Sequence, residues 1–89
     1  MVNHPNRKQT PFQVRAYPGQ LLGKFPTAVD AHRVAAMWSK HWGSWAEVDY
    51  FPRDGKGAGL VGQFDKGEPT REFAHLREML VNNHILSEG

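Results

Sequence analysis

Cysteine is absent from the chain, and so is any long run of apolar residues. The lack of cysteine excludes disulfides, thiol chemistry and Cys-ligated zinc, and it favours a reducing, cytoplasmic location. A membrane-spanning helix needs at least about 18 apolar residues in succession, and a signal peptide needs an apolar core near its start. Neither pattern is found in the sequence. We therefore expect an intracellular protein without membrane contact.

Motifs for catalysis and nucleotide binding are missing as well. The glycine-rich stretch 53–59 lacks the G-x-x-x-x-G-K-[ST] spacing of a phosphate-binding loop and lies between two expected strands, so it is predicted to be a hairpin connection. Glu72 and His75 have the E-x-x-H spacing of di-iron sites, but such sites need a second copy on another helix. We expect no cofactor, no metal ion and no enzymatic activity.

What the chain does have is an uneven distribution of charge. Residues 1–44 carry six basic residues and one acidic residue, whereas residues 45–89 carry five basic and eight acidic residues. The two halves therefore have net charges of +5 and −3, within a total of +2. Such polarity can steer a charged partner, and it can equally let the two halves attract each other.

The length of 89 residues predicts one domain, at residues 12–86, between a flexible arm at 1–11 and a short tail at 87–89. Within this domain, residues 12–43 and 45–83 each have the pattern of two strands followed by a helix. The matched positions include Val14 and Val48, Gly23 and Gly62, Phe25 and Phe64, and His32 and His75. The two matched glycines can mark places where another element approaches closely. One hairpin with one helix cannot bury its apolar face, whereas two such units can share a core.

In the first unit, alternation over 12–17 predicts a strand, and Pro18-Gly19 favours a type II turn before a second strand at 21–25. A helix is predicted from Thr27, which can cap it, to Gly43, which can end it. The apolar stripe of this helix includes Trp38 and Trp42, which are expected in the core, whereas His32 is expected on its flank.

The second unit has predicted strands at 45–51 and 60–64, a turn at 65–68, and a helix from Pro69-Thr70 to Asn82-Asn83. Together the units predict an α+β fold. Two ββα repeats form a four-stranded, mainly antiparallel sheet, with both helices packed on one face.

The other face of this sheet is expected to be open, and it is where we look for function. Aromatic and basic side chains on a sheet can stack bases or form a protein interface. The binding candidates on this face and on the long hairpin loop are Arg15, Tyr17, Leu22, Lys24, Trp45, Phe51, Arg53 and Lys56. Glu47 and Asp49 are expected on the same face. They could form a general acid–base pair, but a cross-strand ion pair with Arg15 is the simpler interpretation.

The leading hypothesis is a small non-enzymatic binding or modulator protein. It would act on a protein partner, or on a second copy of itself, through the open sheet face and the basic first half. Small modulators encoded by phages and mobile elements share this compactness and polarised charge.

One alternative is direct binding of nucleic acid, with phosphates held by basic residues that include Arg7 and Lys8, and with Tyr17 or Phe51 stacking on bases. Another is a small enzyme that uses Glu47, Asp49 and a histidine.

Overall fold

The computed structural model describes residues 9–87, and the elements follow one another without a long unstructured segment, except for the loop at 51–58. They are β1 (Phe12–Ala16), β2 (Gln20–Phe25), α1 (Ala28–Trp42), β3 (Trp45–Tyr50), β4 (Gly59–Asp65), β5 (Glu68–Pro69), the 3₁₀-helix η1 (Arg71–Leu76) and α2 (Arg77–Asn82). Most of the predicted arm, with Arg7 and Lys8, and residues 88–89 of the predicted tail lie outside the described residues. None of the helices described is long and apolar enough to cross a bilayer.

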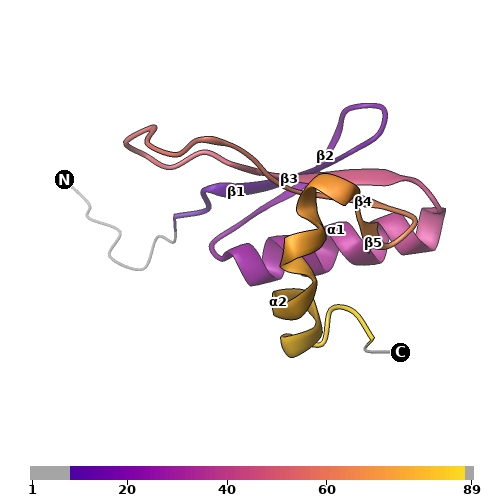
Figure 1. The fold of residues 1–89 in the computed structure, drawn as a ribbon. Helices are drawn as coiled ribbons and strands as arrows, with labels where there is room; N and C mark the ends of the chain where they lie inside the picture. The colour runs from indigo at the N-terminus through magenta and orange to yellow at the C-terminus, as the bar shows by residue number, and fades with distance from the viewer. Residues whose placement is uncertain (1–8, 88–89) are drawn as a thin grey trace.

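The predicted α+β class is confirmed. All strand pairs are antiparallel, and the sheet has the order β2-β1-β3-β4-β5. In Figure 1 the sheet lies above α1, and α2 lies on the same side of the sheet as α1. The two central strands, β1 and β3, are paired so that Val14 lies opposite Val48. Residues that match in the two halves of the sequence therefore meet at the centre of the sheet.

The sheet has five strands instead of the predicted four. Lys66 and Gly67 both have a positive φ, 54° and 85°, which makes the turn after β4 a tight two-residue turn. The chain therefore runs straight back, and the short strand β5 pairs with the end of β4. The sequence pattern predicted a turn at this place, but two residues are too few to give a strand signal.

Both predicted ends of the first helix are confirmed. Thr27 has an extended backbone, and its side-chain oxygen accepts a hydrogen bond from the Asp30 N–H at 3.1 Å. Gly43 ends α1 in the left-handed conformation, with φ 61°. The buried core under the sheet consists of Val14, Ala31, Ala35, Ala36, Ala46, Val48, Phe64 and Leu80.

The predicted second helix is interrupted. It begins as η1 and continues as α2, and Phe73 has non-helical backbone angles inside η1. Thr70, at its start, makes no side-chain capping bond, and its hydroxyl donates to the Gln63 side chain on β4 at 3.0 Å. η1 consequently stays against β4 and β5, while α2 packs against α1.

Each hairpin has a β-bulge at the same relative position. In the first hairpin the pairing shifts after Val14, so that Leu22 has no partner, and in the second it shifts after Val48, so that Val61 has none. Leu22 and Val61 both pack against the core. The expected position of Leu22 on the open face is therefore wrong, because the bulge turns it toward the helices.

Two further predictions for the first half are wrong. The Tyr17–Pro18 peptide bond is cis, and the Gly19 N–H donates to the Ala16 carbonyl at 2.6 Å. The central residues of this turn are thus Tyr17 and Pro18, and the turn is not of type II. Trp42 is 64% exposed instead of buried, and its ring lies edge-on to that of His41, with 4.9 Å between the ring centroids.

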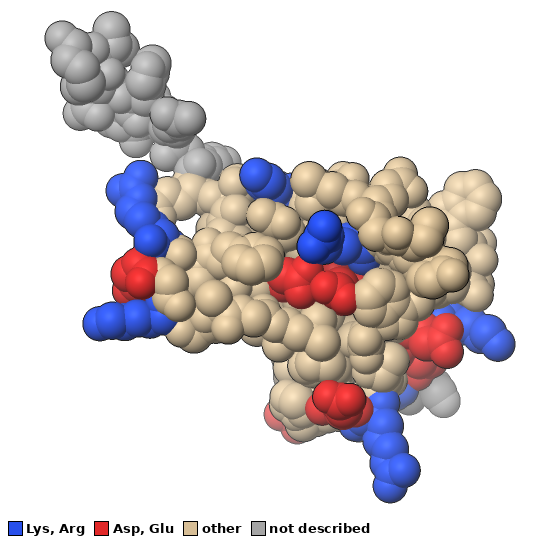
Figure 2. Space-filling model, turned by 90° about the horizontal axis from the view of Figure 1, so that it is seen from above, with Lys and Arg blue, Asp and Glu red and all other residues tan. Residues whose placement is uncertain are grey.

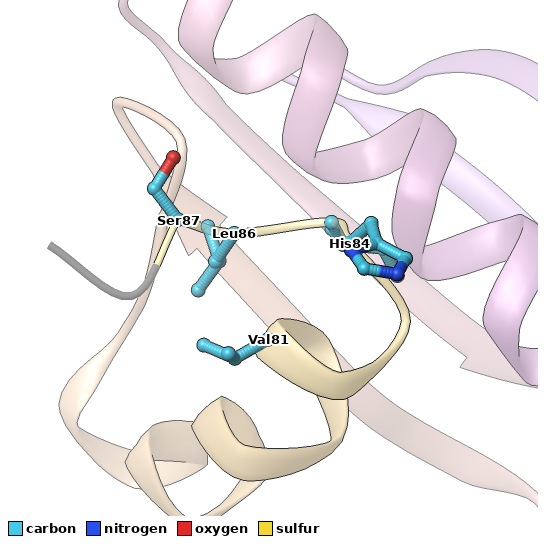
Figure 3. Close-up of a pocket in the computed structure, with 5 residues that line it drawn as sticks. Val81, His84, Leu86 and Ser87 are labelled. Carbon is cyan, nitrogen blue, oxygen red and sulfur yellow. The ribbon is translucent and has the colours of Figure 1, made fainter.

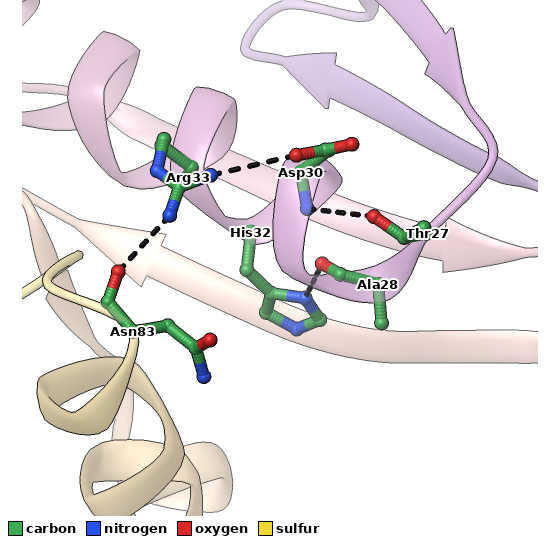
Figure 4. A network of polar contacts seen from close by, with 6 residues as sticks. All are labelled: Thr27, Ala28, Asp30, His32, Arg33 and Asn83. Carbon is green, nitrogen blue, oxygen red and sulfur yellow. Dashed lines mark hydrogen bonds and ion pairs between the residues drawn. The ribbon is translucent and has the colours of Figure 1, made fainter.

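His32, expected on the flank of α1, is buried and makes a local hydrogen bond within the helix. Its Nδ1 lies 2.7 Å from the Ala28 carbonyl oxygen, which can only accept, so Nδ1 carries the hydrogen (Figure 4). Its Nε2 has no hydrogen-bond partner and lies against Gly62 of β4, where a Cβ atom would be only 2.4 Å away. The close approach expected at a matched glycine is therefore found at Gly62.

The buried Ser39 joins α1 to two turns. Its hydroxyl donates to the Ser44 carbonyl at 2.6 Å and accepts from the Gly67 N–H at 2.9 Å.

We expect Ser39→Ala to lower the free energy of unfolding by about 1–3 kcal/mol, because the buried Gly67 N–H loses its partner. Chemical denaturation measures this. Ser44→Ala is the matched control, since Ser44 makes these contacts with its backbone, and an equal loss in both variants would contradict the role of the Ser39 hydroxyl.

Candidate functional site

The face of the sheet opposite α1 is not covered by any helix described in the structure. The segment that directly follows α2 also lies on the helix side, because Ile85 and Leu86 pack against the core there and the N–H groups of both donate to the Leu80 carbonyl. Figure 2 shows this face, with acidic side chains near its centre and basic side chains next to them.

The strand register arranges the side chains of this face in two rows, since residues directly opposite each other in antiparallel strands share a face. We call these eight residues the open face. One row consists of Leu21, Arg15, Glu47 and Gln63, and the other of Lys24, Gln13, Asp49 and Leu60. In each row the four residues come from β2, β1, β3 and β4 in that order.

Aromatic side chains mark the two ends of the open face. At one end the Tyr17 N–H donates to the Trp45 carbonyl at 3.1 Å, which extends the pairing of β1 with β3 into the turn. At the other end the Phe51 N–H donates to the Pro11 carbonyl at 2.7 Å. Tyr17 and Phe51 are both exposed. The result is a charged and polar centre between two exposed aromatic ends.

Glu47 and Asp49 form a carboxyl pair in the middle of the open face. They are two residues apart on β3, and Asp49 is only 6% exposed although it faces away from the core. The pKa of Glu47 is raised to about 7, mainly by burial. The hydrogen bond to Asp49 and the negative charge of Asp49 raise this pKa further, whereas the positive charge of Arg15 lowers it. Glu47 thus changes its charge near neutral pH.

This raised pKa gives a prediction for Glu47→Gln. The native protein binds more protons at Glu47 than the unfolded chain does between the two pKa values, 4.5 and about 7. Stability from this group is therefore lost as the pH rises through that range. After allowance for solvent screening, we expect Glu47→Gln to stabilise the fold by on the order of 1 kcal/mol at about pH 8 and by nothing at about pH 4.

Denaturation curves of both proteins at the two pH values check this prediction. Glu72→Gln, on the exposed side of η1, serves as the control. If Glu47→Gln destabilised the protein more at pH 8 than at pH 4, the carboxyl pair would not be repulsive.

The structure brings some of the candidate residues together and separates others. Arg15, Lys24 and Trp45 share the side of the sheet that carries the open face, and Tyr17 and Phe51 lie at its ends. Arg53 and Lys56 are exposed in the loop beyond β3, away from the basic half of the sheet. Arg53 borders a hollow of about 240 Å³ together with Phe51 and Pro11.

The cross-strand ion pair expected for Arg15 is not formed. Arg15 lies opposite Glu47 in the register, yet the two ion pairs among the described residues are Arg33 with Asp30 and Arg77 with Glu68. Arg15 is exposed. Its guanidinium group is therefore available to a ligand outside the chain.

Sequence reasoning missed Leu21 and Leu60, which are 49% and 42% exposed on the open face. The bulges bring them to this face, since each bulge turns the following residue, Leu22 or Val61, toward the core. In each hairpin a leucine stands two residues before the matched glycine. This shared position is the sequence signal that could have identified Leu21 and Leu60 as candidates.

The histidines do not join the carboxyl pair. His32 lies under the sheet, and the other described histidines belong to α1, to η1 or to the segment after α2. Nowhere in residues 9–87 do three or more His, Asp or Glu side chains form a group that could hold a metal ion. None of the histidines in residues 9–87 therefore lies beside the carboxyl pair.

A hollow of about 420 Å³ lies on the helix side, at the end of α2 (Figure 3). Its lining residues are Val81, His84, Ile85, Leu86 and Ser87. Among the described residues of this lining, His84 is the one titratable group, and none of them is a carboxylate.

Comparisons of the chain with protein-family models, with curated proteins and with solved structures give no match.

Proposed function

We propose that this chain is a small non-enzymatic binding protein that recognises a protein partner through the open face. The observation that carries this proposal is an uncovered sheet face that combines exposed Leu21 and Leu60 with an unpaired Arg15 and a partly buried carboxyl pair. Protein interfaces combine apolar contact area with a few directional polar groups in this way. Aromatic side chains at both ends of the face add the residue types that interfaces favour.

The charges on the open face favour a protein over a nucleic acid. Arg15 and Lys24 are balanced by Glu47 and Asp49, which lie at the centre. Phosphates would meet this carboxyl pair, whereas a protein can present groups of both signs. We expect no complex with single- or double-stranded probes in mobility-shift assays at low salt, and a salt-sensitive complex would favour the nucleic-acid alternative.

We also infer that the two hairpins derive from one duplicated unit. The two bulges at equivalent positions and the pairing of Val14 with Val48 support this, because they relate the hairpins by an approximate two-fold axis through the sheet centre. Between the copies, the core positions are similar and the open face has changed from basic to acidic. Function is then expected at the positions that differ.

Capture of a partner tests the proposed function. The immobilised chain is exposed to a lysate of the organism that encodes it, in three forms: wild type, Leu21→Asp with Leu60→Asp, and Met37→Asp. Met37 is an exposed apolar residue of α1, on the other side of the sheet, so its variant is the matched control. We expect wild type and Met37→Asp to capture the same protein and the double variant to lose it. Retention by the double variant would place the binding site elsewhere.

A further inference from the structure

The open face is divided into a basic half and an acidic half. The strand β2 contributes Lys24 and β1 contributes Arg15, whereas β3 contributes both Glu47 and Asp49 and β4 contributes the uncharged Gln63 and Leu60. The dividing line runs between β1 and β3, parallel to both strands. This follows directly from the strand order and the register.

A face divided in this way is complementary to a copy of itself. If a second copy is placed over the face by a two-fold axis parallel to β1 and β3, the basic half of each copy covers the acidic half of the other. In this arrangement each row of one copy lies over the same row of the other copy. Arg15 therefore faces Glu47 of the second copy, and Gln13 faces its Asp49. An in-plane axis perpendicular to the strands would instead place Glu47 over Asp49, and like charges would meet. The charge pattern thus selects one axis.

From this arrangement we propose that the partner of the open face is a second copy of the same chain, bound face to face about a two-fold axis parallel to the central strands. This inference rests on the proposed function, because it names the occupant of the same surface. Closed two-fold symmetry uses one patch twice, which a self-complementary patch allows.

Two further observations support self-association. Arg15 lies opposite Glu47 of its own chain without an ion pair, so its charge is available for the second copy. The apolar residues Leu21 and Leu60 lie at the outer ends of opposite rows, where they would be covered. Four strands of about six residues give a face of roughly 20 Å by 20 Å. Two such faces cover about 800 Å² together, which is the size of a weak, transient interface, so we expect a dissociation constant in the micromolar range.

Sedimentation equilibrium of two charge-reversal variants, Arg15→Glu and Glu47→Arg, tests the proposal. Each variant alone brings like charges together at both symmetry-related contacts, so we expect dimerisation at least about tenfold weaker than in wild type. In an equimolar mixture, a heterodimer joins opposite charges at both contacts. At one contact the introduced glutamate faces the introduced arginine, and at the other the unchanged Glu47 of the first variant faces the unchanged Arg15 of the second.

The mixture should therefore regain an affinity close to that of wild type. Circular dichroism establishes that each variant is folded, and Lys56→Glu, in the distant loop, is the charge control.

Three results would overturn the proposal: a wild type that stays monomeric across the micromolar range, single variants that dimerise as wild type does, or a mixture that does not recover. Failure of self-association alone can be told apart from failure of the proposed function, which would show as capture retained by the Leu21→Asp with Leu60→Asp variant. A monomeric chain that still captures another protein through Leu21 and Leu60 would keep the open face as a binding site and remove only self-association.

The dimer is also expected to depend on pH. The charged groups around Glu47 are Asp49 on its own strand, Arg15 on β1 and Asp65 on β4. The pKa of Glu47, raised to about 7, leaves this carboxyl mostly neutral at pH 6. Self-association should therefore be stronger at pH 8 than at pH 6 in wild type, and Glu47→Gln should remove most of that difference. An unchanged difference in Glu47→Gln would contradict the role of this carboxyl in the dimer.

Discussion

Gly62→Ala is expected to destabilise the fold by about 3 kcal/mol. The added Cβ would lie 2.4 Å from Nε2 and 2.8 Å from Cδ2 of His32. The imidazole cannot easily move away, because it is buried and its Nδ1 is bonded to the Ala28 carbonyl. Chemical denaturation followed by circular dichroism measures the loss.

The matched glycine of the first hairpin is the control for this substitution. At Gly23 an added Cβ would lie 3.1 Å from the tip of the Phe25 ring, which is only partly buried and can shift. We expect Gly23→Ala to cost less than about 1 kcal/mol. In a His32→Ala background, Gly62→Ala should cost much less than in wild type, because the clashing ring is gone. Equal losses at both glycines, or no relief in the double variant, would contradict the close packing of α1 on β4.

Leu80→Ala is expected to lower the free energy of unfolding by about 2–5 kcal/mol. Leu80 is the one fully buried residue of α2, and α2 has only six residues, too few to be stable without packing. The residue that follows α2 is also joined to α1, by the hydrogen bond from Arg33 to the Asn83 carbonyl at 3.0 Å (Figure 4). Loss of the Leu80 side chain should therefore loosen α2 and the tail that follows it.

Hydrogen exchange separates this effect from a general loss of stability. We expect amides of α2 and of residues 83–86 to exchange faster in Leu80→Ala while those of β1 and β3 remain protected. Val81→Ala, next in the sequence and only partly buried, should cost less than about 1 kcal/mol. Uniformly faster exchange in all elements would show that α2 unfolds together with the sheet.

The features that the sequence predicted correctly depend on local, periodic signals. Alternating residues in β1 and β3, the Thr27 cap and the Gly43 stop each need only a few neighbouring residues, and the structure confirms them. The comparison of the two halves also indicated that Val14 and Val48 are equivalent, and in the structure they form a cross-strand pair.

The features that the sequence did not predict depend on contacts between distant segments. The bulges shift Leu22 and Val61 toward the core only because the neighbouring strand has one residue fewer at that point. His32 is buried because a glycine on β4 leaves room for its ring, 30 residues away in the sequence. The second helix, predicted as continuous, is interrupted near its start, where the Thr70 hydroxyl donates to the Gln63 side chain on β4. On the candidate site, the residues of the central strands were placed on the correct face, and the errors lie where the pairing register shifts.

Methyl NMR over a dilution series is the most direct test of the claim that this chain binds through its open sheet face. Resonances of Leu21 and Leu60 report on that face, and those of Met37 report on the opposite, helical side. We expect the two leucines to shift with concentration, more strongly at pH 8 than at pH 6, while Met37 stays unchanged. Shifts at Met37 with none at the leucines would contradict the proposed interface.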